Sequence, residues 1–137
     1  MEKIRAGIIG LGQRGYSLLH QNMVDIEKIK ITALCDTYQD RIDAASDCIA
    51  EKCGYRPEIC TTNYKDVIYS NDVDVVMIFA AWEVHIPFAI EAMRAGKPVG
   101  VEVAGAYSID QCWELVKTYE ETKTPIMVLD NCCYARN

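Results

Sequence analysis

Short stretches of branched apolar residues alternate along the chain with segments in which apolar residues recur every three or four positions. The first pattern predicts buried β-strands, and the second predicts amphipathic helices. We expect strands at residues 4–9, 29–35, 58–61, 73–81, 99–103 and 126–129. We expect helices at residues 14–25, 42–53, 63–68, 87–95 and 108–119. Apart from Asp74, the run 73–81 is continuously apolar, which is typical of a strand that helices cover on both sides.

Residues that begin or end helices lie at the expected boundaries. Gly54 and Gly96 are placed to end the second and fourth helices, and Pro87 fits the first turn of the fourth. Asn63 can cap the third helix, and Ser108-x-x-Gln111 forms a capping box for the last. These signals support the same division of the chain as the apolar pattern.

Strands that alternate with helices indicate an α/β fold with a doubly wound parallel sheet, the Rossmann fold. Six strands are what two mononucleotide-binding halves require. The chain continues for only eight residues after the last expected strand (137 − 129). We therefore expect a single dinucleotide-binding domain at residues 1–137, without a second domain.

A glycine-rich turn follows the first expected strand. Gly10-Leu11-Gly12-Gln13-Arg14-Gly15 matches G-x-G-x-x-G, and Asp36 follows the last glycine by 21 residues (36 − 15). Gly10 permits a tight turn, Gly12 lets the backbone approach a pyrophosphate, and Gly15 permits close packing of helix and strand. This context makes the motif a hypothesis of dinucleotide binding. The alternative is a turn that needs glycine and binds nothing.

Asp36 is placed to accept both ribose hydroxyls of NAD, and its charge would repel the 2′-phosphate of NADP. The alternative for Asp36 is an ordinary residue before a helix. Arg41 lies close enough in sequence to soften this selectivity, although we interpret Asp40-Arg41 as a solvated pair on a helix. The sequence therefore predicts NAD as the cofactor, in preference to NADP.

Ligands of such sheets bind beyond the carboxyl ends of the strands. The loops expected there carry further candidates, namely Trp82, His85, Glu102, Val103 and Asn131. Trp82 can cover a ribose or nicotinamide face, and His85 can donate a hydrogen bond. The alternatives are that Trp82 and His85 only cap the core and that Glu102 is purely structural. We interpret the adjacent Cys132 and Cys133 as packing residues.

The net charge and the lengths of the apolar runs exclude some classes of binding partner. Lys and Arg total 14 and Asp and Glu total 20, so the net charge is −6. An acidic chain without a basic cluster is a poor match for nucleic acid or anionic lipid. The longest apolar run, residues 75–82, is too short to span a membrane. We expect neither nucleic acid nor membrane as a partner.

Seven cysteines are present, an odd number, and neither a secretory signal nor a paired Cys/His spacing accompanies them. These features favour reduced thiols in a cytoplasmic protein and no metal site.

The sequence resembles the N-terminal domain of the Gfo/Idh/MocA oxidoreductases along nearly its whole length. The matching segments are Gly10–Gly15, Cys35-Asp36 with Asp40-Arg41, Asp72–Phe79, His85, and Ala95-Gly96-Lys97-Pro98 leading to Glu102. Within the family it is most similar to the NAD-dependent glycoside hydrolases of family 109. That likeness rests on Trp82–Pro87 (W-x-x-H-x-P), Val101-Glu102-Val103 and Asp130–Tyr134.

The resemblance implies an NAD-binding domain whose C-terminal α+β partner domain is absent from this chain. It implies cofactor contacts from Gln13, Arg14, Asp36, Trp82 to His85, Glu102, Val103 and Asn131. It implies a retained NAD that transiently oxidises a sugar hydroxyl so that the aglycone can be eliminated, after which water adds and the sugar is reduced again. The carbohydrate-binding residues of the family lie in the other domain, so the catalytic residues are unknown here.

One departure from the family separates the possible functions. Sugar dehydrogenases of the family carry Glu-Lys-Pro, whose Lys assists proton transfer, whereas this chain has Val103 and Ala104 at the last two positions. Lys97 precedes its strand and so cannot replace that Lys. The alternatives to the glycosidase-like assignment are the cofactor domain of a sugar or polyol dehydrogenase with a base from elsewhere and a non-catalytic NAD-binding module.

Apolar side chains are expected among the loops at the carboxyl ends of the strands, namely Trp82, Val103, Tyr107 and Tyr134. Large apolar patches on a monomer tend to find a partner. We therefore expect a homo-oligomer, associated through this surface in a way that NAD alters.

Overall fold

A computed structural model describes residues 2–103 and 105–134 of the chain. The described strands are β1 (Ile4–Ile9), β2 (Ile29–Cys35), β3 (Ile59–Thr61), β4 (Val75–Ile78), β5 (Val99–Glu102) and β6 (Ile126–Leu129). The described α-helices are α1 (Gln13–Gln21), α2 (Gln39–Cys53), α3 (Tyr64–Ile68), α4 (Trp82–Arg94) and α5 (Ile109–Thr122). Two 3-10 helices, η1 (Met23–Asp25) and η2 (Asn131–Tyr134), complete the described elements.

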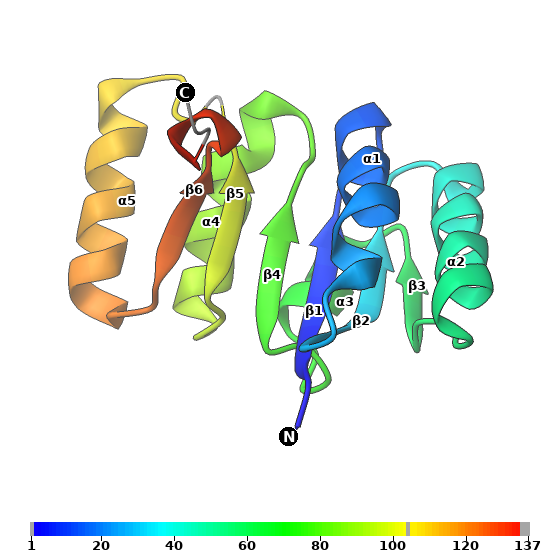
Figure 1. The fold of residues 1–137 in the computed structure, drawn as a ribbon. Helices are drawn as coiled ribbons and strands as arrows, with labels where there is room; N and C mark the ends of the chain where they lie inside the picture. Colours follow the sequence, from blue (N-terminus) through cyan, green and yellow to red (C-terminus); the bar gives the residue numbers. More distant parts are fainter. Residues whose placement is uncertain (1, 104, 135–137) are drawn as a thin grey trace.

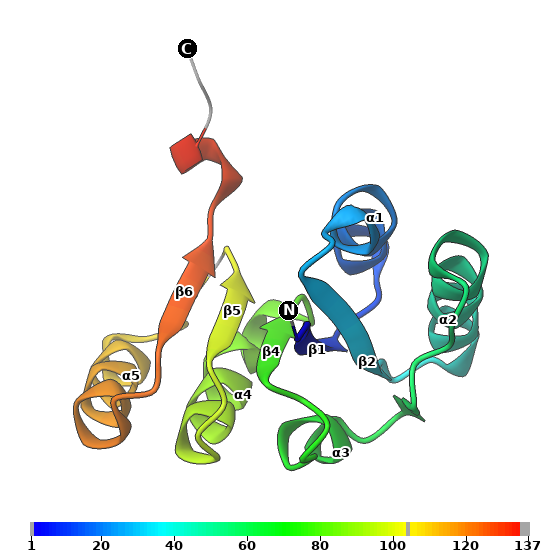
Figure 2. The ribbon, with the colours of Figure 1, turned by 60° about the horizontal axis from the view of Figure 1, so that its bottom comes forward.

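The six strands form one parallel sheet in the order β3-β2-β1-β4-β5-β6. The direction of winding reverses between β1 and β4, which creates the crevice where such sheets bind ligands. Helices α1 and α2 lie on one face, and α3, α4 and α5 lie on the other (Figures 1 and 2). The doubly wound parallel fold expected from the sequence is therefore confirmed.

Two apolar clusters fill the space between the sheet and its helices. One lies between the sheet and α3 and α4, with Val76, Ile78 and Met93 buried in it. The other lies under α1 and α2, around Ile8, Leu34 and Ile42. Strands that face both clusters cannot alternate apolar with polar residues, which explains their continuous apolar sequences.

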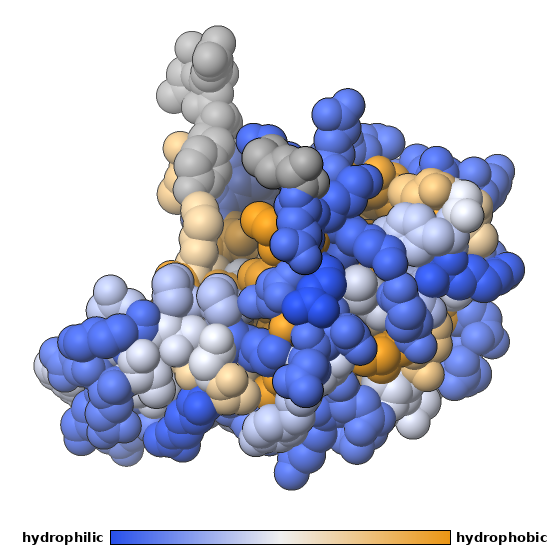
Figure 3. All heavy atoms as spheres, turned by 90° about the horizontal axis from the view of Figure 1, so that it is seen from below, coloured by the Kyte–Doolittle hydropathy of each residue, from blue (hydrophilic) through white to orange (hydrophobic). Residues whose placement is uncertain are grey.

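Ion pairs lie along the amino ends of the strands. Arg5 pairs with Asp74 at 2.7 Å and with Asp72 at 3.3 Å, and Lys30 pairs with Glu58 at 2.6 Å. Figure 3 shows the molecule from this side as a largely hydrophilic surface. The amino edge is therefore charged and well paired, and the cavity described below lies at the opposite edge.

The expected helix boundaries are mostly confirmed. Gly54 caps α2 with a φ of 76°, Asn63 accepts a hydrogen bond from the Lys65 N–H at the start of α3, and the Ser108 hydroxyl accepts one from the Gln111 N–H. The expectation for α4 is wrong. The helix begins at Trp82, so Pro87 lies inside it rather than in its first turn.

The strand before α4 is correspondingly shorter than the sequence predicts. It ends at Ile78 instead of Ala81, because Phe79, Ala80 and Ala81 form the turn into the helix. The residues expected in a loop at 82–85 are consequently the first turn of α4. Within the described ranges, no helix is long and apolar enough to cross a membrane, and no group of three His, Cys, Asp or Glu residues is placed to hold a metal ion.

Candidate cofactor site

The turn between β1 and α1 can be built only with glycine at two positions. Gly10 has a φ of 97°, and a Cβ at this residue would collide with the backbone of Phe79 and Ala80. A Cβ on Gly15 would collide with the carbonyl oxygen of Gly10. The glycines thus bring the end of β1 against the end of β4, at the point where the winding of the sheet reverses.

The amino end of α1 is open to an anion. Gly12 is its N-cap, no side chain caps the helix there, and its first turn contains no acidic residue. A Cβ on Gly12 would meet only Nη1 of Arg41, at 3.7 Å. Uncapped N–H groups and the helix dipole favour a negatively charged group at this end.

Asp36, which follows β2, forms hydrogen bonds with the β1–α1 turn and with the start of the segment before α2. Its Oδ2 accepts a hydrogen bond from the Leu11 N–H at 2.6 Å, and its Oδ1 accepts one from the Tyr38 N–H at 3.0 Å. The residue is 94% buried, yet it lines the cavity. Each carboxylate oxygen has a second lone pair, so Asp36 can still accept hydroxyl groups from a ligand.

Arg41 is exposed to solvent, as the sequence suggests, but it also lies beside Asp36. Its Nη1 lies 3.6 Å from Oδ1 of Asp36, and its guanidinium lies over the Tyr38 ring, 4.5 Å from the centroid. The first turn of α2 carries Arg41 back over the end of β2. The charge of Asp36 is therefore partly balanced by a cation that also faces the cavity.

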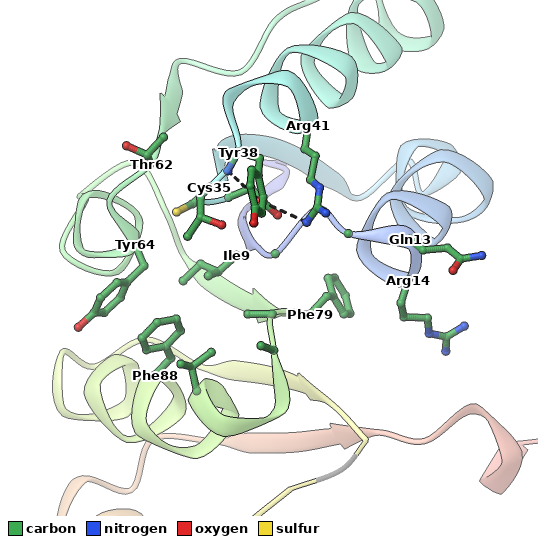
Figure 4. Close-up of a pocket in the computed structure, with 17 residues that line it drawn as sticks. Ile9, Gln13, Arg14, Cys35, Tyr38, Arg41, Thr62, Tyr64, Phe79 and Phe88 are labelled. Atoms are coloured by element: carbon green, nitrogen blue, oxygen red, sulfur yellow. Dashed lines mark hydrogen bonds and ion pairs between the residues drawn. The ribbon is translucent and has the colours of Figure 1, made fainter.

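A cavity of about 600 Å³ opens at the carboxyl ends of β1, β2 and β4. Figure 4 shows Tyr38 and Arg41 on one side of it, Gln13 and Arg14 on another, and Tyr64 near Phe88 on a third. The rings of Tyr64 and Phe88 stack, with centroids 4.0 Å apart. Its lining residues are Ile9, Gly10, Gly12, Gln13, Arg14, Cys35, Asp36, Thr37, Tyr38, Arg41, Thr62, Tyr64, Phe79, Ala80, Ala81, Val84 and Phe88.

Burial keeps the thiol in this wall protonated. It raises the pKa of Cys35 to about 12, and the neighbouring Asp36 adds to the effect. A thiolate is the nucleophilic form of cysteine, so Cys35 contributes an apolar surface to the cavity and no nucleophile.

A second group of candidates meets beside the cavity. Arg14 Nε donates to Oε2 of Glu102 at 2.8 Å, and its Nη2 donates to Oδ1 of Asn131 at 3.4 Å. Oε1 of Glu102 accepts the N–H of Val103 at 2.9 Å. Arg14 thus joins the start of α1 to the ends of β5 and β6, across the reversal point of the sheet.

The two candidates of the W-x-x-H segment, Trp82 and His85, have different environments in the structure. Trp82 is the first residue of α4 and is 61% exposed. His85 is fully buried, and its Nε2 lies 2.9 Å from the carbonyl oxygen of Ala80. Neither side chain lines the cavity. His85 therefore contacts the turn between β4 and α4, and a contact of His85 with a cofactor stays a prediction.

The structure brings five of the twelve candidate residues to the cavity lining: Gly10, Gly12, Gln13, Arg14 and Asp36. Leu11 and Gly15 belong to the turn. Glu102 ends β5, Val103 follows it, and Asn131 lies after β6. Sequence reasoning missed Tyr38, Thr62, Tyr64 and Phe88, and it considered Arg41 only as a residue that could soften the cofactor selectivity. The aromatic residue that follows Asp36 by two positions was a usable signal, whereas Tyr64 and Phe88 meet only because α3 packs beside α4.

No basic side chain takes the position of the missing Lys among the described residues around Glu102, apart from Arg14, which is paired there. Val103 is exposed and apolar, while Ala104 lies outside the described residues. Nζ of Lys97 donates to the carbonyl oxygens of Ser70 and Val73, at 2.7 and 2.6 Å, on the amino side of the sheet. Lys97 is therefore remote from the cavity, as its place before β5 predicts.

A glycine turn against an uncapped helix, with an acidic residue at the end of the second strand, defines a dinucleotide-binding domain. Residues 4–129 match the sequence model of the oxidoreductase family Gfo/Idh/MocA, which is described as an NAD-binding Rossmann fold. The chain belongs to this family, whose cofactor is NAD.

Curated relatives carry glycosidase names. A glycosyl hydrolase family 109 protein of Shewanella baltica is 38% identical over 99% of this chain, and the alpha-N-acetylgalactosaminidase of Shewanella oneidensis is 36% identical over the same share. In both cases the chain spans 30% of the relative's length. The myo-inositol 2-dehydrogenase of Lactobacillus plantarum superposes with a TM-score of 0.85 at 26% identity, over 98% of this chain and 38% of its own.

Proposed function

We propose that residues 1–137 form the NAD(H)-binding domain of a sugar-active enzyme of the glycosidase-like group and that the chain alone binds NAD without turnover. The observation that carries this proposal is the cavity, in which an uncapped helix end and a buried carboxylate face the same space. The assignment to the glycosidase-like group is supported by the 38% sequence identity with a family 109 protein over 99% of this chain. A carbohydrate is the expected substrate of the parent enzyme.

The residues present fit NAD. The N–H groups at the start of α1 would hold the diphosphate, and the close approach is possible because Gly12 has no side chain. Asp36 would accept the ribose hydroxyls through its remaining lone pairs. Arg14, Glu102 and Asn131 would orient the nicotinamide end. NAD, when bound, supplies reversible hydride transfer with a sugar carbon.

The position of Val103 favours the glycosidase-like group over a dehydrogenase. Its side chain has no titratable group, so Val103 supplies no acid or base at the place where the family's dehydrogenases have Lys. The likeness to the myo-inositol 2-dehydrogenase supports the second candidate, the cofactor domain of an NAD-dependent dehydrogenase. In the parent enzyme, accumulation of NADH with a free sugar would identify the dehydrogenase, whereas cleavage of a nitrophenyl glycoside without net NADH would identify the glycosidase.

Calorimetric titration of the chain with NAD and NADP tests the proposal directly. We expect saturable binding of NAD and binding of NADP at least tenfold weaker, because Asp36 faces the position of the 2′-phosphate. Nitrophenyl glycosides should not be hydrolysed by the isolated chain. Absence of NAD binding, or equal affinity for the two nucleotides, would contradict the assignment.

Two further expectations from the sequence remain proposals. All seven cysteines are free thiols in the structure, and reduced thiols are typical of the cytoplasm, where we place the protein. We also propose that the chain forms a homo-oligomer. The expected association surface includes Trp82, Val103 and Tyr107, which are all exposed, and Tyr134, whose side chain lies outside the described part of the chain.

A further inference from the structure

Three exposed apolar residues lie on the outer face of α5, next to the charged residue Glu120. Ile109, Trp113 and Val116 are spaced by four and three residues, which places them in one row along the helix. Their exposed fractions are 76%, 60% and 45%. We call these three residues the α5 row. The outer face of a surface helix is normally polar, so a row of exposed apolar residues is typical of an interaction surface.

The same helix already has a separate inner face. Thr118 is fully buried, Leu115 packs against the core cluster under α4, and Gln111 is half-buried. At about 100° per residue, these positions lie opposite the α5 row. The packing of α5 on its own domain is therefore complete without Ile109, Trp113 and Val116. Figure 1 shows α5 at the outer margin of the molecule, beyond β6, where a second molecule can approach.

We infer that the α5 row is an interface with a second copy of this chain, in which two α5 helices pack antiparallel about a twofold axis. The flanking charges support this arrangement. Asp110 and Lys117 lie on one flank of the row and are seven residues, or about two turns, apart. With an axis near residues 113 and 114, Asp110 of each copy lies opposite Lys117 of the partner subunit. The surface is then complementary to itself, as a twofold interface requires.

The size of the row sets the strength of the association. Fourteen residues of helix are about 21 Å long, and one face of such a helix buries less than the roughly 800 Å² per partner of a standard interface. Trp113 lies at the centre, where an aromatic side chain contributes most. We therefore expect a dimer that dissociates in the range of about 10 μM to 1 mM, rather than a permanent one.

Sedimentation equilibrium of the chain from about 10 μM to 1 mM tests the interface. Trp113→Glu and Val116→Glu should each raise the dimer dissociation constant at least tenfold. Both side chains are exposed, so the variants should keep their helical circular dichroism. Ile26→Glu is the matched control, because Ile26 is an exposed apolar residue outside α5 and should leave the constant unchanged. Lys117→Asp should weaken the dimer, and combining it with Asp110→Lys should restore it.

Two results would overturn the inference. The first is a chain that stays monomeric at 1 mM. The second is a dimer that persists in both α5 variants. An additional NAD-dependent association that is lost in Tyr107→Ser would belong to the strand-end loops proposed above and would be separate from the α5 dimer. The α5 variants are compared in the absence of cofactor, so a failure to bind NAD leaves that comparison unaffected.

Discussion

The guanidinium of Arg14 lies 2.8 Å from the carboxylate of Glu102, although 88 residues separate the two in the chain. Arg14 belongs to the first turn of α1, and Glu102 is the last residue of β5. The pair crosses the reversal point of the sheet and joins its two halves beside the cavity. Because Glu102 is mostly buried and Arg14 nearly half exposed, the pair is only partly screened by solvent.

A double-mutant cycle should detect this pair. We expect Arg14→Gln and Glu102→Gln to be non-additive in thermal unfolding, with a coupling of about 0.5 kcal/mol, since solvent still reaches Arg14. The exposed pair of Arg56 and Asp47 is the control and should show a smaller coupling. Additive effects of Arg14→Gln and Glu102→Gln would mean that the pair does not persist in solution.

Replacing Asp36 should change cofactor selectivity. We expect Asp36→Ala to lower the ratio of NAD affinity to NADP affinity at least tenfold. Arg41 would then face a 2′-phosphate without a competing carboxylate. The Leu11 and Tyr38 N–H groups also lose their acceptor, so stability should fall by about 1–3 kcal/mol. Asp40→Ala removes the same charge from the surface of α2 and should preserve the ratio. An unchanged ratio in Asp36→Ala would exclude Asp36 as the selectivity residue.

Glycine should be required at position 10. Gly10→Ala places a Cβ against the Phe79 and Ala80 backbone in a left-handed conformation, and we expect a loss of more than about 2 kcal/mol of stability. A Cβ at Gly105 would meet nothing within 4 Å, so Gly105→Ala is the matched control. Urea denaturation of the two variants measures the difference. Equal midpoints would show that the β1–α1 turn can relax around the added methyl group.

Acid should weaken the amino edge of the sheet. Hydrogen bonds from Arg5 hold the pKa of Asp74 below the ordinary value of an aspartate side chain. The stabilising charge is thus present above pH 4 and is lost as the pH falls through the lowered pKa of the folded state. Asp74→Asn should melt at a lower temperature than the parent chain at pH 7, and the gap should narrow progressively as the pH falls below 4. A gap that is constant from pH 7 to pH 3 would be incompatible with this account.

Local patterns were sufficient for much of the fold. The apolar runs, Gly54, Asn63 and Ser108 placed the strands and most helix ends, because caps and periodicity act within a few residues. The same reasoning failed at α4. Pro87 is typical of a first helical turn, but here the helix begins at Trp82, and residues 79–81 form the turn that meets Gly10. That contact joins β1 to β4 and has no local signal.

The sequence by itself determined the class of this protein. The spacing of Gly10, Gly12 and Gly15 and the place of Asp36 follow from backbone geometry that any such turn must have. Only the tertiary structure decided which side chains share the site. Arg41 returns over Asp36, Arg14 reaches Glu102, and His85 turns into the core, because these positions depend on how helices pack on the sheet. Interactions between neighbours in sequence can be predicted from the chain, whereas contacts across the sheet require its register and the packing of its helices.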